Sequence, residues 1–376
     1  MNKNSITHQQ FTKIVALDII GVSILSVPSI VIDIAKQDAW IAALLASFFG
    51  LLLAGLLYLF GRLFTGQTLI QFCQHLLGKY LGNGIALLYI FFFFIGSTTL
   101  LWDIGQFTTS SVLTDTPRLV INFTYLIIVI ASVRLGVVTI ARSAEILFLV
   151  FLGIYVVFSI LILPQIHLEN IQPVLEATTP ALGQAAFILL SFTSLTLFRL
   201  LMFYPQHVPP GRATARAFLV GTLIGNGVLL VIIVLSILAL GTQLSPLLAY
   251  AGHTLARVIS VGQFIERIEG TMTTLWYISM LIRITLYFHC LVVGFAQVVR
   301  LSDFRVVTLP LGMIVLLFSL FIYPDFDYAA KWNREVWPLY AFTHGVLFPL
   351  LLAIVYWFRN SSLPAAEQKE SPSQTS

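Results

Sequence analysis

Charge is scarce in this chain: only 10% of its 376 residues are Asp, Glu, Lys or Arg, whereas roughly 25% is usual for a soluble domain. Apolar residues make up 58% of the sequence and include 30 phenylalanines. Because so few charged side chains cannot cover a water-facing surface, the composition excludes a soluble globular protein. It predicts a polytopic integral membrane protein.

Other scarcities exclude further classes of chemistry. The two cysteines, Cys73 and Cys290, stand alone without histidines at a metal-ligand spacing, so the sequence supports neither a disulfide nor a metal site. The net charge of +4 is spread over loops, without the dense basic cluster that binds nucleic-acid phosphates. No nucleophile–base pair emerges either. We therefore expect no enzyme, no cofactor and no nucleic-acid partner.

Apolar runs of roughly 20 residues, the length that crosses a bilayer, occur about ten times. We expect spans at approximately 11–32, 39–61, 83–110, 119–133, 144–163, 183–204, 217–240, 271–299, 306–323 and 338–358. The less apolar segments 66–80 and 245–262 are interpreted as interfacial or re-entrant helices. Residues 1–360 are expected to form one transmembrane domain, followed by a disordered cytoplasmic tail over 361–376.

The order of the spans predicts an inverted repeat. Spans one to five, about 11–163, and spans six to ten, about 183–358, form halves of similar length. Because five is odd, two such halves must cross the membrane in opposite senses. Lys and Arg are enriched on the cytoplasmic side, and with the N-terminus inside the tally is twelve inner against six outer. Both termini are therefore expected in the cytoplasm.

The first span is interrupted at its own centre. It reads Asp18-Ile-Ile-Gly21-Val22-Ser23-Ile-Leu-Ser26-Val-Pro28. Gly, Ser and Pro weaken a helix, and lipid cannot hydrogen-bond to an unwound backbone. Such a segment survives only inside protein or beside a watery cavity, and discontinuous helices form the binding sites of many secondary transporters. The break therefore predicts a small-molecule site.

Asp18 lies one helical turn before the break, and a charge within a membrane span must face protein or water. It could bind a substrate cation, take up a proton or order the unwound segment. Alternatively, it forms a structural ion pair with Arg283 or Arg199. For Arg199 we favour a side chain that snorkels to the cytoplasmic interface. Asp103, near the outer end of the third span, is explained by an interfacial position.

A second weak point is expected in span six. Shifting the first break by about 170 residues reaches the most hydroxyl-rich part of that span. This part lacks Gly and Pro, and Ser and Thr are also common in ordinary packed membrane helices. The residues expected to form the ligand site are Asp18, Gly21, Val22 and Ser23 from the first span and Ser191, Thr193, Ser194 and Thr196 from the sixth.

The segment that leads into span eight carries a short charged pattern, Phe264-Ile-Glu266-Arg267-Ile-Glu269-Gly270. Acids near a helix N-terminus are favoured by the helix dipole, and Glu266 and Glu269 share one face. One interpretation is a capped helix start with an internal ion pair. The other is that Glu266, Arg267 and Glu269 form an outer gate or a contact with a partner subunit.

Four features taken together carry a family resemblance. They are Ile6-Thr7-His8-Gln9-Gln10-Phe11, the Gly21–Pro28 break, Lys36-Gln-Asp38-Ala-Trp40 and Phe264-Ile-Glu266-Arg267-Ile-Glu269. Over nearly the whole chain they resemble the spore germination permease family, the B subunit of germinant receptors, within the amino acid/polyamine/organocation transporter superfamily. The resemblance implies two inverted five-helix repeats with helices one and six unwound around a pocket. It also implies a germinant, often an amino acid, and two companions in the spore inner membrane, an A subunit and a C lipoprotein.

By position, the resemblance assigns Gly21, Val22 and Ser23 to the unwound backbone that meets a substrate carboxylate, and the helix-six hydroxyls to the facing side. The superfamily often has an acid in the helix-six break, and some proton-coupled relatives use a lysine in helix five; this chain has neither. Asp18 is then the obvious partner for a ligand ammonium or a coupled proton. We expect a germinant-sensing subunit, with a proton- or sodium-coupled secondary transporter of amino acids or amines as the alternative.

Overall fold

The computed structural model describes residues 5–64, 66–245, 248, 250–258 and 269–361, and every regular element among them is a helix. The first half contains α1 (His8–Ile20), α2 (Ser23–Ala35), η1 (Lys36–Asp38), α3 (Ala39–Gly61), η2 (Arg62–Phe64), α4 (Leu69–Ser111), α5 (Arg118–Leu135), α6 (Val137–Leu161), η3 (Leu163–Gln165) and η4 (Leu168–Ile171). The second contains α7 (Thr179–Phe192), η5 (Ser194–Met202), α8 (Arg212–Leu244), α9 (Ala251–Val258), α10 (Glu269–Val299), α11 (Arg305–Phe321), α12 (Phe326–Lys331), η7 (Trp332–Val336), α13 (Trp337–Phe342), η8 (Thr343–Leu347) and α14 (Phe348–Ser361).

Within the described residues these helices make ten passes. Eight helical runs are long and apolar enough to span a membrane. One of them, Ser23–Phe64, contains both α2, which completes the first pass begun by α1, and α3, which forms the second. The shorter apolar helix α11 supplies the ninth pass, and the run from α12 to α14 forms the tenth. The predicted all-helical membrane fold, with its first and sixth passes broken, is confirmed.

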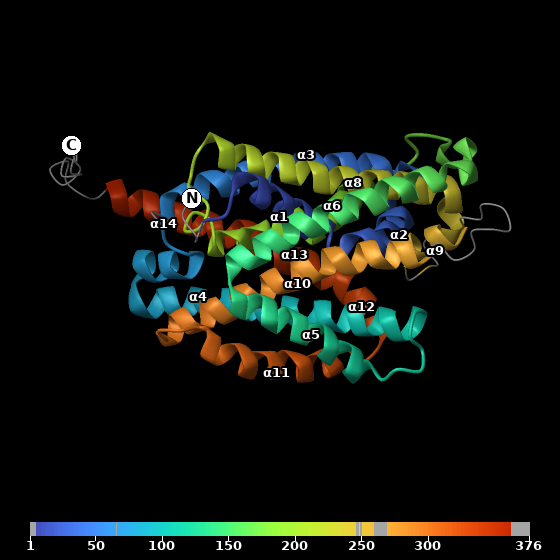
Figure 1. Ribbon diagram of the computed structural model, residues 1–376. Coiled ribbons are helices and arrows are strands. Elements are labelled where there is room, and N and C mark those ends of the chain that lie inside the picture. The colour runs from blue at the N-terminus through green and yellow to red at the C-terminus, as the bar shows by residue number, and fades with distance from the viewer. Residues whose placement is uncertain (1–4, 65, 246–247, 249, 259–268, 362–376) are drawn as a thin grey trace.

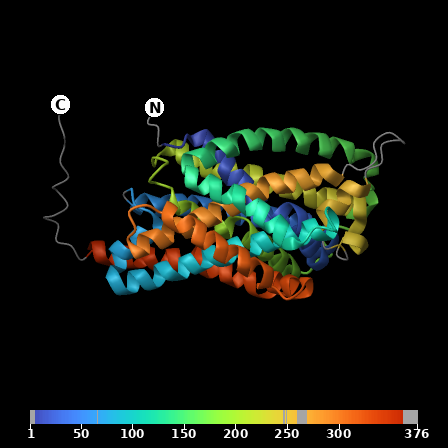
Figure 2. The same cartoon turned by 60° about the horizontal axis from the view of Figure 1, so that its bottom comes forward.

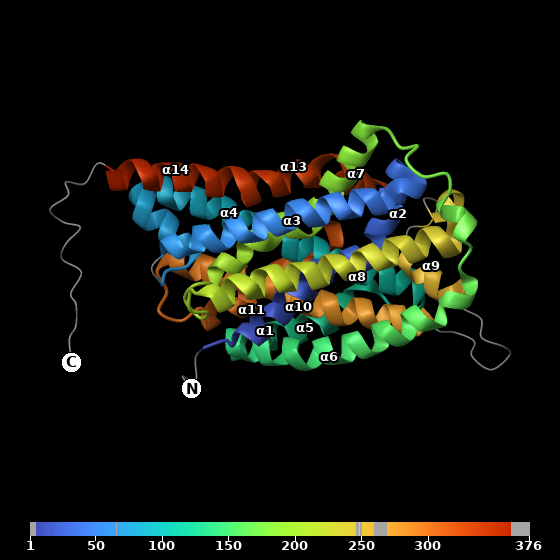
Figure 3. The same ribbon diagram turned by 90° about the horizontal axis from the view of Figure 1, so that it is seen from above.

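The passes lie side by side along one common direction (Figures 1 and 3). The start of α1 and the end of α14 lie at the same end of the bundle, termed here the N-terminal end, and α9 lies at the opposite end. The broken first pass is enclosed by protein, because α1 packs against α6, α8 and α10, and α2 packs against α7, α8 and α9. In Figure 2 the green α6 runs along one edge of the bundle and the red α14 along the other.

Burial separates central from peripheral passes. The most apolar windows of α7–η5 and α10 are 89% and 83% buried, whereas those of α5 and α6 are 22% and 28% buried. Leu149 on α6 and Phe321 on α11 are examples of the large apolar side chains that stay exposed on the outer passes. An apolar side chain that faces lipid is not exposed to water, so these passes need no polar face. The core lies around the two broken passes.

Three sequence-based boundaries change. The first break is two residues long, Gly21 and Val22, and Pro28 lies within α2 rather than inside the break. The segment 66–80 is continuous with the third pass as the start of α4, set off only by non-helical backbone at Gly78 (φ 78°). In the segment 245–262, α9 is the helical part, and residues 259–268 lie outside the described residues.

Candidate ligand site at the two helix breaks

The first break depends on a glycine that admits an arginine side chain. The N–H of Gly21 donates the last helical bond of α1, to Leu17 O at 3.0 Å, and α2 begins only at Ser23. A Cβ atom on residue 21 would lie 2.2 Å from Cδ of Arg283, so only glycine fits this approach. The freed Gly21 carbonyl accepts a bond from Ser279 Oγ at 3.3 Å.

The second break lacks a glycine of its own. At Thr193 the backbone leaves the helix (φ −105°, ψ −92°), and the pass continues as the tighter 3₁₀-helix η5. Two glycines on other passes make room for it. A Cβ at Gly50 on α3 would lie 2.4 Å from Ser194 Oγ, and one at Gly345 on η8 would lie 2.1 Å from the carbonyl oxygen of Leu195. Neighbouring helices thus permit the close packing of this break.

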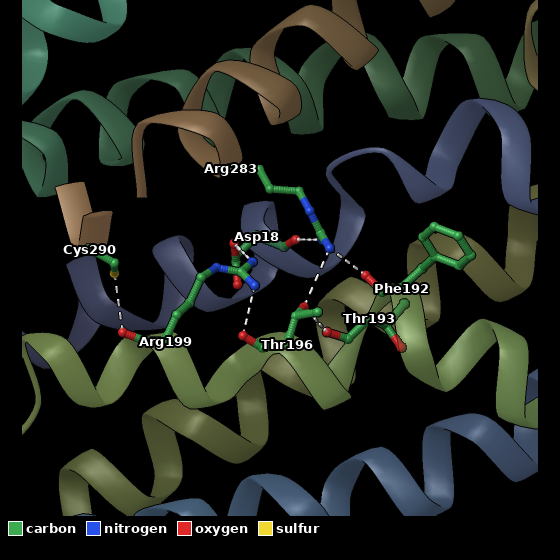
Figure 4. A network of polar contacts seen from close by, with 7 residues as sticks. All are labelled: Asp18, Phe192, Thr193, Thr196, Arg199, Arg283 and Cys290. Carbon is green, nitrogen blue, oxygen red and sulfur yellow. Dashed lines mark hydrogen bonds and ion pairs between the residues drawn. The ribbon is translucent and has the colours of Figure 1, made fainter. Parts of the chain in front are cut away.

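Arg283 ties the two breaks together (Figure 4). Its Nη1 donates to the Asp18 carbonyl near the end of α1, and its Nη2 donates to the Phe192 carbonyl at the end of α7, at 2.7 Å. A weaker bond of 3.4 Å reaches Thr196 Oγ1. Carbonyls at half-helix C-termini carry partial negative charge and coordinate cations in many transporters. Here a guanidinium occupies two of them.

Asp18 forms a fully buried ion pair with Arg199. Arg199 Nη1 also donates to Thr196 O at 2.7 Å, and its guanidinium lies 4.2 Å from the ring centroid of Tyr287. The interpretation that Arg199 snorkels to the interface is therefore wrong. Of the alternatives for Asp18, the structure shows the pair with Arg199. With Arg283 beside them, the three groups carry one surplus positive charge.

Two adjacent hollows lie beside the breaks, towards the α9 end of the bundle. The larger has a volume of about 220 Å³ and is lined by residues of α2, α4, α10, α12 and η7, including Ser26, Trp102, Trp276 and Arg334. The smaller, about 20 Å³, reaches Arg283, Phe192 and Tyr287. Residues Val22, Asp103 and Asn333 line both hollows. We term the pair the ligand cavity.

A neutral hydroxyl contributes to the wall of the ligand cavity. Tyr323, in the connection between α11 and α12, lines the smaller hollow and packs edge-on against Trp102 with ring centroids 5.0 Å apart. Burial, assisted by the nearby Asp103 carboxylate, raises the pKa of the Tyr323 phenol well above its usual value. This side chain therefore stays protonated and can donate a hydrogen bond, but it offers no charge to a ligand.

A third hollow, about 630 Å³, opens at the N-terminal end of the bundle and is lined partly by His289 and Arg305. On α10 the side chains between Arg283 and His289 are buried, including Tyr287 and Phe288. Together with Arg199 they separate the ligand cavity from this end. In this conformation the site faces the α9 end.

The structure brings the two sets of predicted site residues together, but most of them are buried in the protein core and do not line the cavity. Of the eight, Val22 alone lines the ligand cavity. Fully buried beneath it are Asp18, Ser23, Ser191, Thr193, Ser194 and Thr196, and Gly21 is buried as well. Glu266 and Arg267 lie outside the described residues. Glu269, at the start of α10, has its Oε2 atom 3.7 Å from Arg257 Nε, a half-exposed ion pair.

Sequence reasoning missed the residues that face the ligand cavity from other passes. Asp103 on α4 and Asn333 on η7 reach both hollows, and Trp337 on α13 reaches the smaller one. For Asp103 a signal existed, because an ionisable residue within a span is by default a functional candidate. For Asn333 and Trp337 the sequence offered none, since their position depends on how the tenth pass folds back over the cavity.

The fold and the site define a class: an integral membrane protein on an inverted-repeat transporter scaffold, with a charged centre between two broken helices. Two solved structures share this fold. One is Mhp1, a nucleobase-cation-symport-1 family transporter in a closed conformation with bromovinylhydantoin bound; the TM-score is 0.69 at 14% identity, over 96% of this chain and 81% of that one. The other is MhsT in complex with L-phenylalanine, with a TM-score of 0.67 at 14% identity, over 95% and 99%.

The sequence narrows the class to a family. The model described as "Spore germination protein" matches residues 5–326, and the chain belongs to that family. Spore germination protein KB of Bacillus subtilis (strain 168) is 25% identical over 361 residues, which cover 94% of this chain and 95% of that protein. Spore germination protein YndE of the same organism is 23% identical over 300 residues, covering 79% and 82%. The resemblance drawn from the sequence is confirmed.

Proposed function

We propose that this chain is the germinant-sensing membrane subunit of a spore germinant receptor, and that a small polar ligand, most simply an amino acid, binds in the ligand cavity. One observation carries the proposal. In a member of the spore germination protein family, two broken helices meet under a cavity that reaches both breaks through Val22, Phe192 and Arg283. Binding there would bear on both repeats at once.

The proposed setting follows from charge. With twelve of the Lys and Arg residues on the side of the N-terminus and six on the other, both termini lie in the cytoplasm and the α9 end faces outward. In the spore inner membrane the ligand cavity would then open toward molecules that diffuse in from outside. The transmembrane domain over residues 1–360 would act as one unit, with an A subunit and a C lipoprotein as its companions.

The contacts support a sensing mechanism that needs no chemical step. Arg283 holds a carbonyl in the last turn of α1 and the last carbonyl of α7, so a ligand that binds its guanidinium would change the link between the two repeats. Ligand binding shifts a two-state protein toward the state that it binds better. The rearranged bundle would be read by the companion subunits. The buried pair of Asp18 and Arg199 stays as the fixed pivot beneath the site.

A blocked cavity tests the proposal. Ser26 lines the larger hollow, and Ser26→Trp would fill it without touching the ion pair beneath. In spores with normal receptor levels we expect at least tenfold more germinant to be needed for the same germination rate. The matched control is Ser111→Trp, at the exposed end of α4, outside the hollow. An unchanged dose response for Ser26→Trp would contradict the proposed site.

Transport is the second candidate, because the fold is shared with solved transporters. The occupied carbonyls argue against cation-coupled uptake, since Arg283 takes the half-helix ends that could coordinate a coupling ion. We expect proteoliposomes that contain this chain alone to bind labelled ligand without concentrating it. Concentrative uptake driven by a sodium or proton gradient would favour the transporter.

A further inference from the structure

We propose that the ligand is a zwitterion with an uncharged side chain, whose carboxylate binds Arg283 and whose ammonium binds Asp103. The inference rests on the proposed function, because it specifies what the ligand cavity recognises. It differs from the expectation drawn from the sequence, in which Asp18 and the unwound backbone bind the two charged ends.

The acid of this pair is Asp103. It lies on α4, is half-buried and lines both hollows of the ligand cavity. Within the described residues the structure gives its carboxylate no hydrogen bond and no ion pair, in contrast to Asp18, which is neutralised by Arg199. A partly desolvated carboxylate without a partner is costly, and a ligand ammonium would relieve that cost.

The base is Arg283. Its side chain is only 1% exposed, and it reaches the smaller hollow from α10. Its two terminal nitrogens bond to the Asp18 and Phe192 carbonyls, while Nε has no partner among the described residues. A guanidinium carries five N–H donors, so donors remain for a ligand carboxylate. Since Arg199 pairs with the Asp18 carboxylate, Arg283 has no ion-pair partner in the part of the chain that the structure describes.

The balance of charge selects a zwitterion over an anion or a cation. With Asp103 ionised, the acids Asp18 and Asp103 and the arginines Arg199 and Arg283, which are the charged groups that the described residues place at the two breaks and the smaller hollow, sum to zero net charge. A ligand with net charge would leave one buried charge uncompensated, which proteins avoid. An amino acid adds one charge of each sign and keeps the balance, with both ends in charge-assisted bonds.

The lining of the larger hollow favours a ligand with an uncharged side chain. Above the charged floor the larger hollow is lined mainly by apolar and aromatic groups, among them Leu25, Ile30, Trp276 and Phe326. Arg334, the arginine that the described residues contribute to this wall, bonds to an Asp33 carboxylate oxygen at 2.6 Å and is therefore already paired. A volume of about 220 Å³ suits a small uncharged side chain.

The ligand classes can be separated with the purified full chain in lipid nanodiscs. The probes are the twenty standard L-amino acids and, for each one that binds, its carboxamide, its N-acetyl derivative and the acid that lacks the amino group. Binding is read from the thermal unfolding midpoint and from tryptophan fluorescence, since Trp102, Trp276 and Trp337 line the cavity. We expect an uncharged amino acid to bind, and the analogues that lack either charge to bind at least 30-fold more weakly.

Asp103 variants test the ammonium contact without disturbing the arginine that holds the breaks. Asp103→Asn should weaken the amino acid at least tenfold and abolish its preference over the acid that lacks the amino group. Asp103→Glu should restore part of the affinity. Asp115→Asn, the same exchange in the exposed connection beyond α4, should change nothing.

Each result decides the inference separately from the proposed function. If Asp103→Asn leaves amino-acid binding unchanged, or weakens the amino acid and the acid without the amino group equally, recognition by charge is wrong. The same holds if the carboxamide binds as well as the amino acid, or if no amino acid binds at all. In all these cases the germination response of Ser26→Trp spores still tests whether the ligand binds in the cavity. If Ser26→Trp spores also germinate normally, both the proposed function and this inference are wrong.

Discussion

The two helix breaks do the same work by different means. The first contains its own glycine, and Gly21 admits Arg283 against the backbone. The second has no glycine, and the room around it comes from Gly50 and Gly345 on two other passes. Arg283 then joins the breaks by bonding to a carbonyl of each. A helix can therefore be broken either by its own residues or by the shape of its neighbours, and only the first kind is visible in the sequence of the segment.

The largest effect is expected at the ion pair between the breaks. Asp18→Asn would leave Arg199 buried without a counter-charge and should lower the free energy of unfolding by about 3–5 kcal/mol. Chemical denaturation of the protein in detergent measures this loss. The double variant Asp18→Leu/Arg199→Leu should recover most of it, because replacing both partners leaves no unpaired charge.

A matched pair at the edge of the bundle provides the control. Lys13 and Glu145 lie 2.7 Å apart with side chains 19% and 35% exposed, so Glu145→Gln should cost about 1 kcal/mol or less. Equal losses of unfolding free energy for Asp18→Asn and Glu145→Gln would show that burial does not make the Asp18–Arg199 pair more important for stability than a pair at the edge.

The next effect separates the two glycine arrangements. Gly345→Ala would press a Cβ against the backbone oxygen of Leu195, which has no freedom to move, and should cost about 1–3 kcal/mol. Gly21→Ala would press a Cβ against Cδ of Arg283 and displace the buried guanidinium from the carbonyls of both breaks, so it should cost at least as much stability and should also weaken the germinant response. Unfolding free energies and spore dose responses for both variants measure the contrast.

Gly153→Ala on α6 is the neutral reference, because a Cβ there meets no atom of the described residues within 4 Å. It should leave stability unchanged or raise it slightly, since alanine favours helix over glycine. If Gly345→Ala behaves like Gly153→Ala, the second break does not depend on its neighbours.

The difference between the two breaks also explains how much of the fold and the site can be predicted from the sequence. The spans and the first break depend on local composition, such as Gly21 close to two serines, and can therefore be predicted from the sequence. The start of η5 at Ser194 was reached only by analogy with the first half, because its cause lies on α3 and η8. The sequence places Asp103 only near the membrane interface. Its position at the smaller hollow beside Arg283 depends on the packing of α4 against α10, which no local pattern shows. Pairings between distant charges depend on tertiary contacts that no local pattern reports.

A smaller effect is expected from the hydroxyls that support the breaks. Thr196→Val removes the bond from Oγ1 to Thr193 O (2.9 Å) and the weak acceptor for Arg283, so it should cost about 0.5–1.5 kcal/mol. Ser279→Ala removes the 3.3 Å bond to Gly21 O. The Ser279 hydroxyl is also shared with two carbonyls of α10, so this variant should cost less stability. Denaturation midpoints compare the two, and a reversed order would mean that the first break is the more dependent on its hydroxyl support.

No effect at all is expected from sodium. Because Arg283 already supplies a fixed cation to the carbonyls of both breaks, ligand affinity in nanodiscs should be the same in sodium and in choline buffers. A sodium-dependent gain in affinity would place a coupling ion at the breaks and would favour the transporter.

The most direct test of the central claim is whether Val22, at the first break, can be reached from outside and shielded by ligand. The two native cysteines, Cys73 and Cys290, are buried, so Val22→Cys provides a clean target for a membrane-impermeant thiol reagent, and Leu17→Cys, buried below the break, is the control. The account predicts that Val22→Cys is labelled from the outer face only, that Leu17→Cys is not labelled, and that a bound amino acid protects Val22→Cys. Absence of outer labelling, or labelling that no ligand of the cavity slows, would contradict it.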